Sequence, residues 1–273
     1  MKLPIIKSAI IAGGLALGAS SAYAGDALTV VSWGGAYTKS QIEAYHKPYT
    51  AKYGTKIQSE DYNGGLAEIR AQVEAGKITW DVVDLEVSDA ARGCDDGLFE
   101  KISAGSLPNG VNGALPSKDF IPGALQECAV GTIVWSTIYA YDADKYKSKK
   151  PTTISDFFDV KKFPGKRGMR KVPKVNLEWA LMADGVDGKD VYKVLATKAG
   201  QDRAFKKLDT IKNDVLWWEA GAQPPQMLAD GEVVMTSAYN GRIFNAAVTE
   251  KKNFEIVWDR QLFSFDLYAI IKG

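Results

Sequence analysis

The stretch GTIVWSTIYAY, residues 131–141, decides the fold of this chain. Most of its positions are apolar and β-branched or aromatic, which predicts a long, largely buried strand. A second apolar run, residues 262–271, comes near the end of the chain. One strand that leaves a lobe and another that returns predict two α/β lobes with a cleft between them. Ligand sites favour clefts of this kind.

The first 24 residues have the features of a secretory signal peptide. A start with two lysines precedes an apolar core at residues 9–17, and the small-residue cleavage site Ala-Tyr-Ala occupies residues 22–24. A membrane anchor needs about 20 apolar residues, and this run is shorter. We therefore expect export to the periplasm with cleavage after Ala24.

Composition excludes some classes of partner. The chain has 273 residues, 46% hydrophobic and 25% charged, as is usual for soluble globular proteins. Loss of the signal peptide removes two lysines and no acid, so the net charge becomes +1 − 2 = −1. A nearly neutral body without a basic tail argues against nucleic acid as a partner.

Cys94 and Cys128 are the only cysteines of the chain, which we expect to be exported. We expect them to form a disulfide, with two separately buried thiols as the alternative.

Strand and helix patterns alternate through both halves of the chain, which predicts an α/β fold. In the first half we expect strands at residues 28–33, 55–60 and 80–85, helices at 36–53 (divided near Pro48) and 66–75, and a loop at 103–122. In the second half we expect strands at 167–172, 215–218 and 233–237 and helices at 153–159, 176–183, 201–211, 225–229 and 243–251. We assign residues 25–137 to lobe 1, 138–261 to lobe 2, and 262–273 to a strand that returns to lobe 1.

The sequence offers little for catalysis. The single histidine, His46, lies in the charged helical stretch 43–47, where a solvated position is the better interpretation. The chain contains no Gly-x-Ser-x-Gly turn, no phosphate-binding loop and no His/Cys metal spacing. We therefore expect that the protein is not an enzyme and that it has no cofactor and no metal site. The alternative from another functional class is a secreted hydrolase.

Aromatic and acidic residues gather at the expected strand ends and in the two crossing runs. Ligands of open α/β sheets bind beyond the carboxyl ends of the strands, and aromatic faces with carboxylates suit an organic cation. Asp266 is the strongest candidate for ligand binding, because a carboxylate in an apolar strand is costly to bury unless it is paired or binds a ligand. The candidate ligand-binding residues are Trp33, Tyr37, Glu86, Trp135, Thr137, Trp218, Glu219, Tyr239 and Asp266.

Several segments resemble the spermidine/putrescine-binding group of periplasmic solute-binding proteins, which serve ABC importers. The resemblance rests on Val31-Ser32-Trp33 with Tyr37, Trp80-Asp81-Val82-Val83, the run 131–141, Gly231-Glu232-Val233-Val234-Met235 through Tyr239-Asn240-Gly241, and Phe265-Asp266-Leu267. It covers nearly all of residues 25–273. It implies a type II-like fold of two hinged lobes, a monomer that closes on a cationic amine and delivers it to a permease in the inner membrane.

The resemblance also implies roles for single residues. Trp33 and Tyr37 match aromatics of the polyamine box, Tyr239 stands at the place of a pocket tryptophan, and Asp266 matches the acid that holds an amine.

Two departures from the family pattern bear on the ligand. Residues 170–174 read Arg-Lys-Val-Pro-Lys where the family has acids, and Ser264 stands where an aromatic wall is expected. An amino-acid-like or opine-like ligand with an amine and a carboxylate is therefore the alternative to a polyamine. A ferric-iron binder is more remote, because Tyr239 stands alone. Family members continue past the returning strand, so we expect this chain to be truncated at its C-terminal end.

Overall fold

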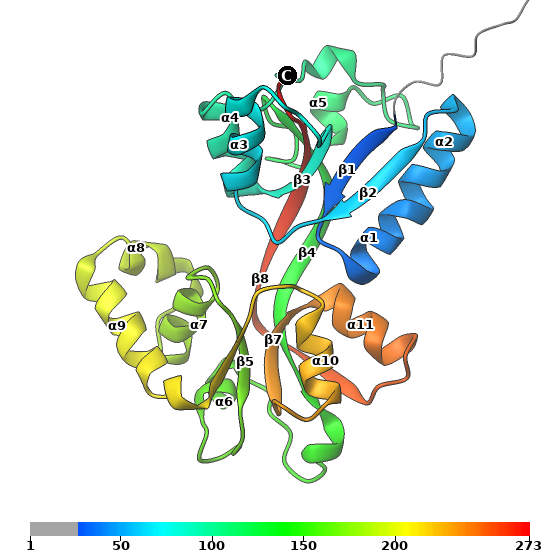
Figure 1. Cartoon of the computed structure of the whole chain (residues 1–273). Coiled ribbons are helices and arrows are strands. Elements are labelled where there is room, and N and C mark those ends of the chain that lie inside the picture. The colour runs from blue at the N-terminus through cyan, green and yellow to red at the C-terminus, as the bar shows by residue number, and fades with distance from the viewer. Residues whose placement is uncertain (1–26) are drawn as a thin grey trace, which may run out of the picture.

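The computed structural model describes residues 27–273, and the predicted signal peptide lies outside them. One eight-stranded mixed sheet runs through the molecule in the order β2-β1-β3-β8-β4-β7-β5-β6. Its strands are β1 (Leu28–Ser32), β2 (Ile57–Asp61), β3 (Val82–Glu86), β4 (Ala129–Asp142), β5 (Arg167–Arg170), β6 (Val215–Trp218), β7 (Met235–Tyr239) and β8 (Phe254–Ile270). Two lobes share this sheet: lobe 1 holds β1 to β3, and lobe 2 holds β5 to β7 (Figure 1).

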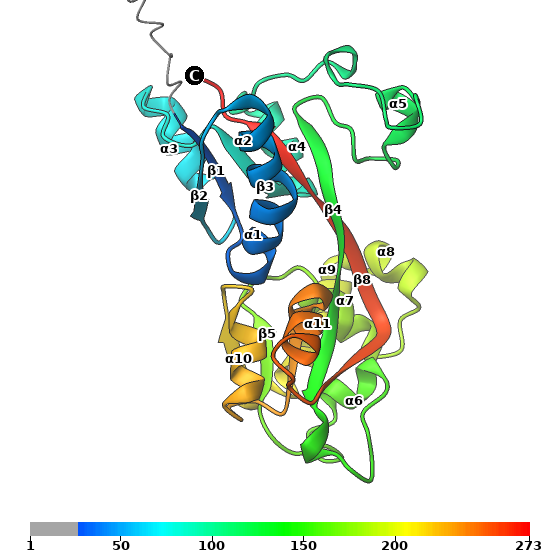
Figure 2. The same ribbon diagram turned by 90° about the vertical axis from the view of Figure 1, so that its right-hand side faces the viewer.

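The long strands β4 and β8 connect the lobes, as the two apolar runs predicted. They pair antiparallel from Ala129 opposite Ala269 to Asp142 opposite Phe254, and both run the length of the molecule (Figure 2). β8 also pairs with β3 in lobe 1, and β4 pairs with β7 in lobe 2. The returning strand is longer than expected, because it begins at Phe254 and not at residue 262.

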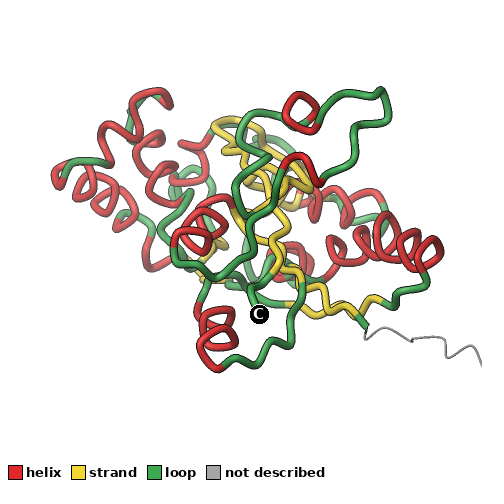
Figure 3. Tube along the Cα trace, turned by 90° about the horizontal axis from the view of Figure 1, so that it is seen from above, coloured by secondary structure: helices red, strands yellow, loops and turns green. Residues whose placement is uncertain are grey.

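Helices cover both sides of the sheet, so the strands lie in the middle of the molecule when it is seen from above (Figure 3). The helices of lobe 1 are α1 (Gly35–Gln41), α2 (Lys47–Tyr53), α3 (Ala67–Ala75), α4 (Val87–Asp95) and α5 (Pro116–Asp119). Those of lobe 2 are α6 (Ile154–Phe158), α7 (Asn176–Ala183), α8 (Val191–Leu195), α9 (Lys198–Asp209), α10 (Gln223–Ala229) and α11 (Asn240–Val248). None of the helices within residues 27–273 is long and apolar enough to cross a membrane.

Pro48 was expected to divide the first helix, but the chain remains helical on both sides of it. α1 continues through the π-helical turn Ile42–His46 into α2, where Pro48 occupies the first turn. Proline has no N–H to donate, and a wider turn ahead of it keeps the chain helical. The expected loop at 103–122 also contains two short helical turns, Ala104–Ser106 and Pro116–Asp119.

The prediction for His46 was wrong. Its side chain is 6% exposed and its Nδ1 lies 3.1 Å from the hydroxyl of Ser59 on β2. Burial lowers the pKa of His46, so the ring packs as a neutral group between helix and sheet. The charged neighbours Glu43 and Lys47 face solvent and pair with each other, and they concealed the buried face from the sequence pattern.

Each lobe has its own apolar core. Val31, Ile69 and Phe99 are buried in the core of lobe 1, and Phe157 and Trp179 in that of lobe 2. The disulfide prediction is confirmed, because Cys94 of α4 is bonded to Cys128 ahead of β4 with a Cα–Cα distance of 5.7 Å.

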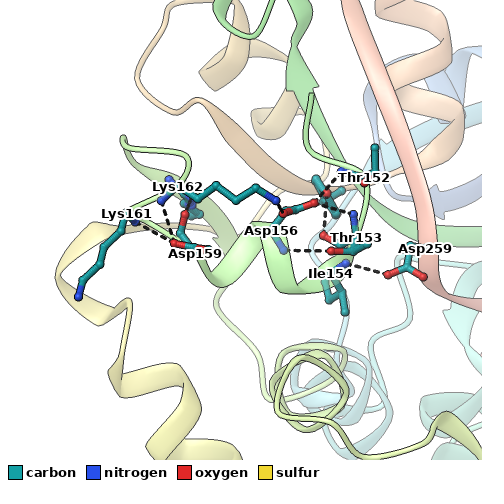
Figure 4. Close-up of polar contacts among 10 residues, drawn as sticks. Thr152, Thr153, Ile154, Asp156, Asp159, Lys161, Lys162 and Asp259 are labelled. Carbon is teal, nitrogen blue, oxygen red and sulfur yellow. Dashed lines mark hydrogen bonds and ion pairs between the residues drawn. The ribbon is translucent and has the colours of Figure 1, made fainter. Parts of the chain in front are cut away.

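The start of α6 fastens lobe 2 to the returning strand (Figure 4). Thr153 and Asp156 form a capping box, in which each side chain accepts a hydrogen bond from the backbone N–H of the other residue. Asp259 of β8 accepts a hydrogen bond of 2.8 Å from the N–H of Ile154. β8 therefore supports lobe 2 as well as crossing to lobe 1.

Candidate functional site

A cavity of about 330 Å³ lies where the two lobes meet, and we call it the main cavity. Its volume is within the range of about 300–1,000 Å³ that is usual for small-molecule sites. Lobe 1, the crossing strands and lobe 2 all contribute. The lining residues are Trp33, Ala36, Tyr37, Ser40, Glu86, Ile133, Val134, Trp135, Tyr239, Asn240, Gly241, Arg242, Asn245 and Asp266.

Six of the nine candidate residues line this cavity together: Trp33, Tyr37, Glu86, Trp135, Tyr239 and Asp266. Thr137 and Trp218 line a smaller cavity next to it, the side cavity, of about 40 Å³. Glu219 lies in neither. It follows the edge strand β6, is 67% exposed, and pairs with Lys171 at 3.1 Å. The structure therefore places Glu219 at the solvent-exposed edge of the sheet and apart from the other candidate residues.

Asp266 is the buried acid of the main cavity. It lies on β8 opposite Glu86 of β3, is 5% exposed, and accepts a hydrogen bond of 2.7 Å from Trp135 Nε1. Burial and the charge of Asp84 raise the pKa of Asp266 to about 8. Within residues 27–273 no basic side chain forms an ion pair with Asp266. Its ionised form therefore lacks the partner that a buried carboxylate needs.

Asp84 is a second buried acid, which the sequence interpretation missed. It stands two residues before Glu86 on β3, so both side chains point to the same face of the sheet. One of its oxygens accepts hydrogen bonds from Ser32 (2.9 Å) and Gln41 (2.6 Å), and burial raises its pKa to about 6. Side chains of a strand alternate between its two faces, so the choice of Glu86 as a candidate should also have indicated Asp84.

Aromatic rings form much of the wall. Trp135 and Tyr239 meet edge to face with centroids 5.0 Å apart, and Trp33 packs against Tyr62 at the same distance. Trp33 Nε1 and the Tyr37 hydroxyl are buried without a hydrogen-bond partner in residues 27–273. Burial raises the pKa of Tyr37, so its hydroxyl keeps its proton. Both groups lie close to Asp84, and their hydrogen-bonding donors lower the pKa of its carboxyl.

Glu86 joins the two lobes. Arg170 Nη1 donates to its Oε1 at 2.8 Å, and Lys174 Nζ donates to its Oε2 and, at 2.7 Å, to Ser88 of α4. Burial opposes ionisation of Glu86, but the charges and hydrogen bonds of Arg170 and Lys174 outweigh it and lower its pKa. Glu86 lines the site as expected, with its carboxylate already held by two cations.

Arg242 is the functional candidate that the sequence interpretation missed. It lies in the first turn of α11, is 8% exposed, and donates to the carbonyl of Trp33 in lobe 1 at 2.8 Å. A Cβ on Gly35 or Gly221 would come within 2.8 or 2.9 Å of the guanidinium, so these glycines make room for it. No acid within residues 27–273 forms an ion pair with Arg242, although the main cavity exposes it. The place of Arg242 directly after the quoted segment Tyr239-Asn240-Gly241 was the available signal.

The described residues show no metal centre, since residues 27–273 contain no group of three His, Cys, Asp or Glu side chains placed to hold an ion. The site instead combines aromatic walls with charges of both signs, and this arrangement suits binding of a small organic ion. The model of the family "bacterial extracellular solute-binding protein" matches residues 44–273. This chain belongs to that family. It is a solute-binding component of an ABC importer and not an enzyme.

Single relatives agree with this assignment. The chain is 46% identical over 260 residues to the gamma-aminobutyric acid-binding protein of Pseudomonas aeruginosa, a match that covers 95% of this chain and 71% of the relative. It is 32% identical to the structure of MotA from A. tumefaciens B6 in complex with glucopine, with a TM-score of 0.82 and coverage of 90% and 74% of the two chains. The structure of the Atu4243–GABA receptor is 33% identical, with a TM-score of 0.74 and coverage of 91% and 73%.

These relatives confirm part of what the sequence predicts and correct part of it. The two-lobed periplasmic binding protein fold and the importer family are confirmed. An extracellular family also agrees with export to the periplasm, while the cleavage site lies outside the described residues. The narrower assignment to the polyamine-binding group is not supported, because the relatives named here carry γ-aminobutyrate and glucopine in their names.

Proposed function

We propose that this protein captures a small ligand with an ammonium group and a carboxylate, of the γ-aminobutyrate type, and delivers it as a monomer to an ABC permease. In this proposal, residues 25–137 and 138–261 form the lobes that close on the ligand. One observation carries the proposal: the main cavity holds a buried carboxylate, Asp266, and a buried guanidinium, Arg242, and neither has an ion-pair partner within residues 27–273. A zwitterionic ligand provides a counter-ion for both.

Asp266 would hold the ammonium end. Trp135 donates to one oxygen of its carboxylate, which leaves the other oxygen for the ligand. The rings of Trp135 and Tyr239 lie beside it in the cavity wall. A cation over an aromatic face gains about 0.5–2 kcal/mol, and a hydrogen bond to a charged group about 1.5–3 kcal/mol.

Arg242 would hold the carboxylate end. Asn240, Gly241 and Arg242 form the first turn of α11 and line the cavity, so the free N–H groups at the helix start add to the positive charge of the guanidinium. Arginine suits this role because its planar fork of donors matches the two oxygens of a carboxylate.

A diamine fits this site less well than a zwitterion. It would need a second free acid, but Glu86 is bound by Arg170 and Lys174, and Glu219 lies outside the cavity. The second amine of the diamine would then meet Arg242. The names of two relatives, a γ-aminobutyric acid-binding protein and a GABA receptor, support the zwitterion as well.

Three four-carbon compounds that differ only in their end groups test the proposal: γ-aminobutyrate, putrescine with two amines, and succinate with two carboxylates. We expect isothermal calorimetry to show that γ-aminobutyrate binds at least about tenfold more tightly than either, a difference of about 1.4 kcal/mol. Putrescine binding as tightly as γ-aminobutyrate would contradict the proposal and restore the polyamine reading.

A further inference from the structure

The side cavity has no assigned role, although it adjoins the main cavity. The two share Glu86, Trp135 and Tyr239 as common walls. Thr137 of β4 adds one more wall, and the rest come from lobe 2, where β5, β6 and β7 meet the start of α7. Its volume of about 40 Å³ is that of one small polar group, since a water molecule in the liquid takes up about 30 Å³.

Two buried polar atoms belong to residues of the side cavity and have no hydrogen-bond partner in the described part of the chain. They are Nε1 of Trp218 and the hydroxyl of Ser237, and both residues are 1% exposed. The indole N–H can only donate. A buried donor without an acceptor is unfavourable, and native proteins leave few of them. These two groups of the side cavity therefore lack a partner that accepts a hydrogen bond.

The charges around the side cavity point to the same kind of occupant. Arg170 and Lys174 contribute two positive charges and Glu86 one negative charge, which leaves +2 − 1 = +1. Val175, another wall residue, has a φ of 70°, a strained value for a β-branched residue. Such strain gathers at sites that clamp ligands.

We propose that the side cavity is a second subsite, which takes an oxygen acceptor of the ligand, such as a carboxylate or a carbonyl. Trp135 lines both cavities and donates to Asp266, so the acceptor belongs close to the ligand ammonium. The inference rests on the proposed function and narrows it. The ligand class becomes amino acids that carry a distal carboxylate for Arg242 and a second oxygen group next to the amine.

Glutamate is the matched probe, because it is γ-aminobutyrate with a second carboxylate on the carbon that bears the amine. We expect one glutamate enantiomer to bind about tenfold more tightly than γ-aminobutyrate in isothermal calorimetry, or about 1.4 kcal/mol. Ser237→Ala should remove this advantage and leave γ-aminobutyrate binding unchanged, and Trp218→Phe should also remove the advantage. Glu219→Gln, outside both cavities, is the control that should alter neither. Melting curves of each variant show whether it is folded, and Ser237→Ala provides the test if Trp218→Phe is not.

The outcomes separate this inference from the proposed function. If γ-aminobutyrate binds and both glutamate enantiomers bind no more tightly, the side cavity holds only water and the inference fails alone. The same conclusion follows if Ser237→Ala weakens both ligands equally. If neither γ-aminobutyrate nor glutamate binds while putrescine does, the proposed function fails, and the inference fails with it.

Discussion

The two walls of the cleft carry opposite charges. Asp84, Glu86 and Asp266 lie on one face of the neighbouring strands β3 and β8, while Arg170, Lys174 and Arg242 come from lobe 2. Where Glu86 meets Arg170 and Lys174, charges of the two walls already form ion pairs. Asp266 and Arg242 have no such partner within residues 27–273. The first group therefore joins the lobes, and in the proposed function the second binds a ligand with charges of both signs.

Replacing Asp266 should have the largest effect on binding. Asp266→Asn keeps the size of the side chain and removes the negative charge, so the ligand ammonium loses its counter-ion. We expect the affinity for γ-aminobutyrate to fall by about ten- to a hundredfold, since a hydrogen bond between charged groups contributes about 1.5–3 kcal/mol. Isothermal calorimetry measures the change, with Glu219→Gln as the control. An unchanged affinity in Asp266→Asn would remove the amine site.

Replacing Arg242 tests the opposite wall. Arg242→Gln should weaken γ-aminobutyrate binding about tenfold and should improve putrescine binding, because the guanidinium no longer repels the second amine. Arg242→Lys keeps the charge but loses the planar fork, so it should lie between the parent and Arg242→Gln. Competition binding with γ-aminobutyrate and putrescine measures these opposite changes in affinity. Equal losses for both ligands would show that Arg242 only supports the backbone of Trp33.

The pH dependence of binding should separate the unpaired acid from the paired one. Asp266 must be ionised to hold an ammonium, and burial with the charge of Asp84 raises its pKa to about 8. At pH 6 the ligand therefore has to displace a proton, whereas at pH 8 about half of the sites are already ionised. We expect the affinity to rise at least about tenfold from pH 6 to pH 8 and then level off. Calorimetric titrations in buffers of different ionisation enthalpy should show that ligand binding releases a proton at pH 6. An affinity that does not change between pH 6 and pH 8 would contradict the role of Asp266 as the ammonium partner.

Removing the charge of Glu86 should act mainly on stability. Glu86→Gln leaves the guanidinium of Arg170, 16% exposed, without its acid. We expect the free energy of unfolding in urea to fall by about 1–3 kcal/mol, with the smaller share from Lys174 because its side chain is half exposed. Glu219→Gln breaks an exposed pair and should change stability by less than about 0.5 kcal/mol. Equal effects of the two variants would mean that Glu86 does not join the lobes.

The strongest sequence signals were those that depend on neighbouring residues alone. The apolar runs in β4 and β8 predicted the two crossings, and Asp266 was recognised because a carboxylate within such a run is costly to bury. His46 was misjudged because its neighbours along the chain are charged, whereas its burial depends on β2, which packs against its helix.

The missed or misplaced site residues depend on contacts between distant segments. The place of Arg242 in the site depends on α11 packing against lobe 1, where the guanidinium lies beside Gly35 and donates to the carbonyl of Trp33. Likewise, the pairing of Glu86 with Arg170 joins residues 84 positions apart. Glu219 was misplaced because the sequence does not show that β6 is an edge strand.

A crystal structure of the protein with γ-aminobutyrate would show directly which charged group holds each end of the ligand. We expect the ligand ammonium within about 3 Å of the Asp266 carboxylate and the ligand carboxylate within the same distance of the Arg242 guanidinium. Glu86 should remain bound to Arg170 and Lys174. A ligand bound in the reverse orientation, or one whose carboxylate displaces Glu86 from Arg170, would contradict the division of the cleft into paired and unpaired charges.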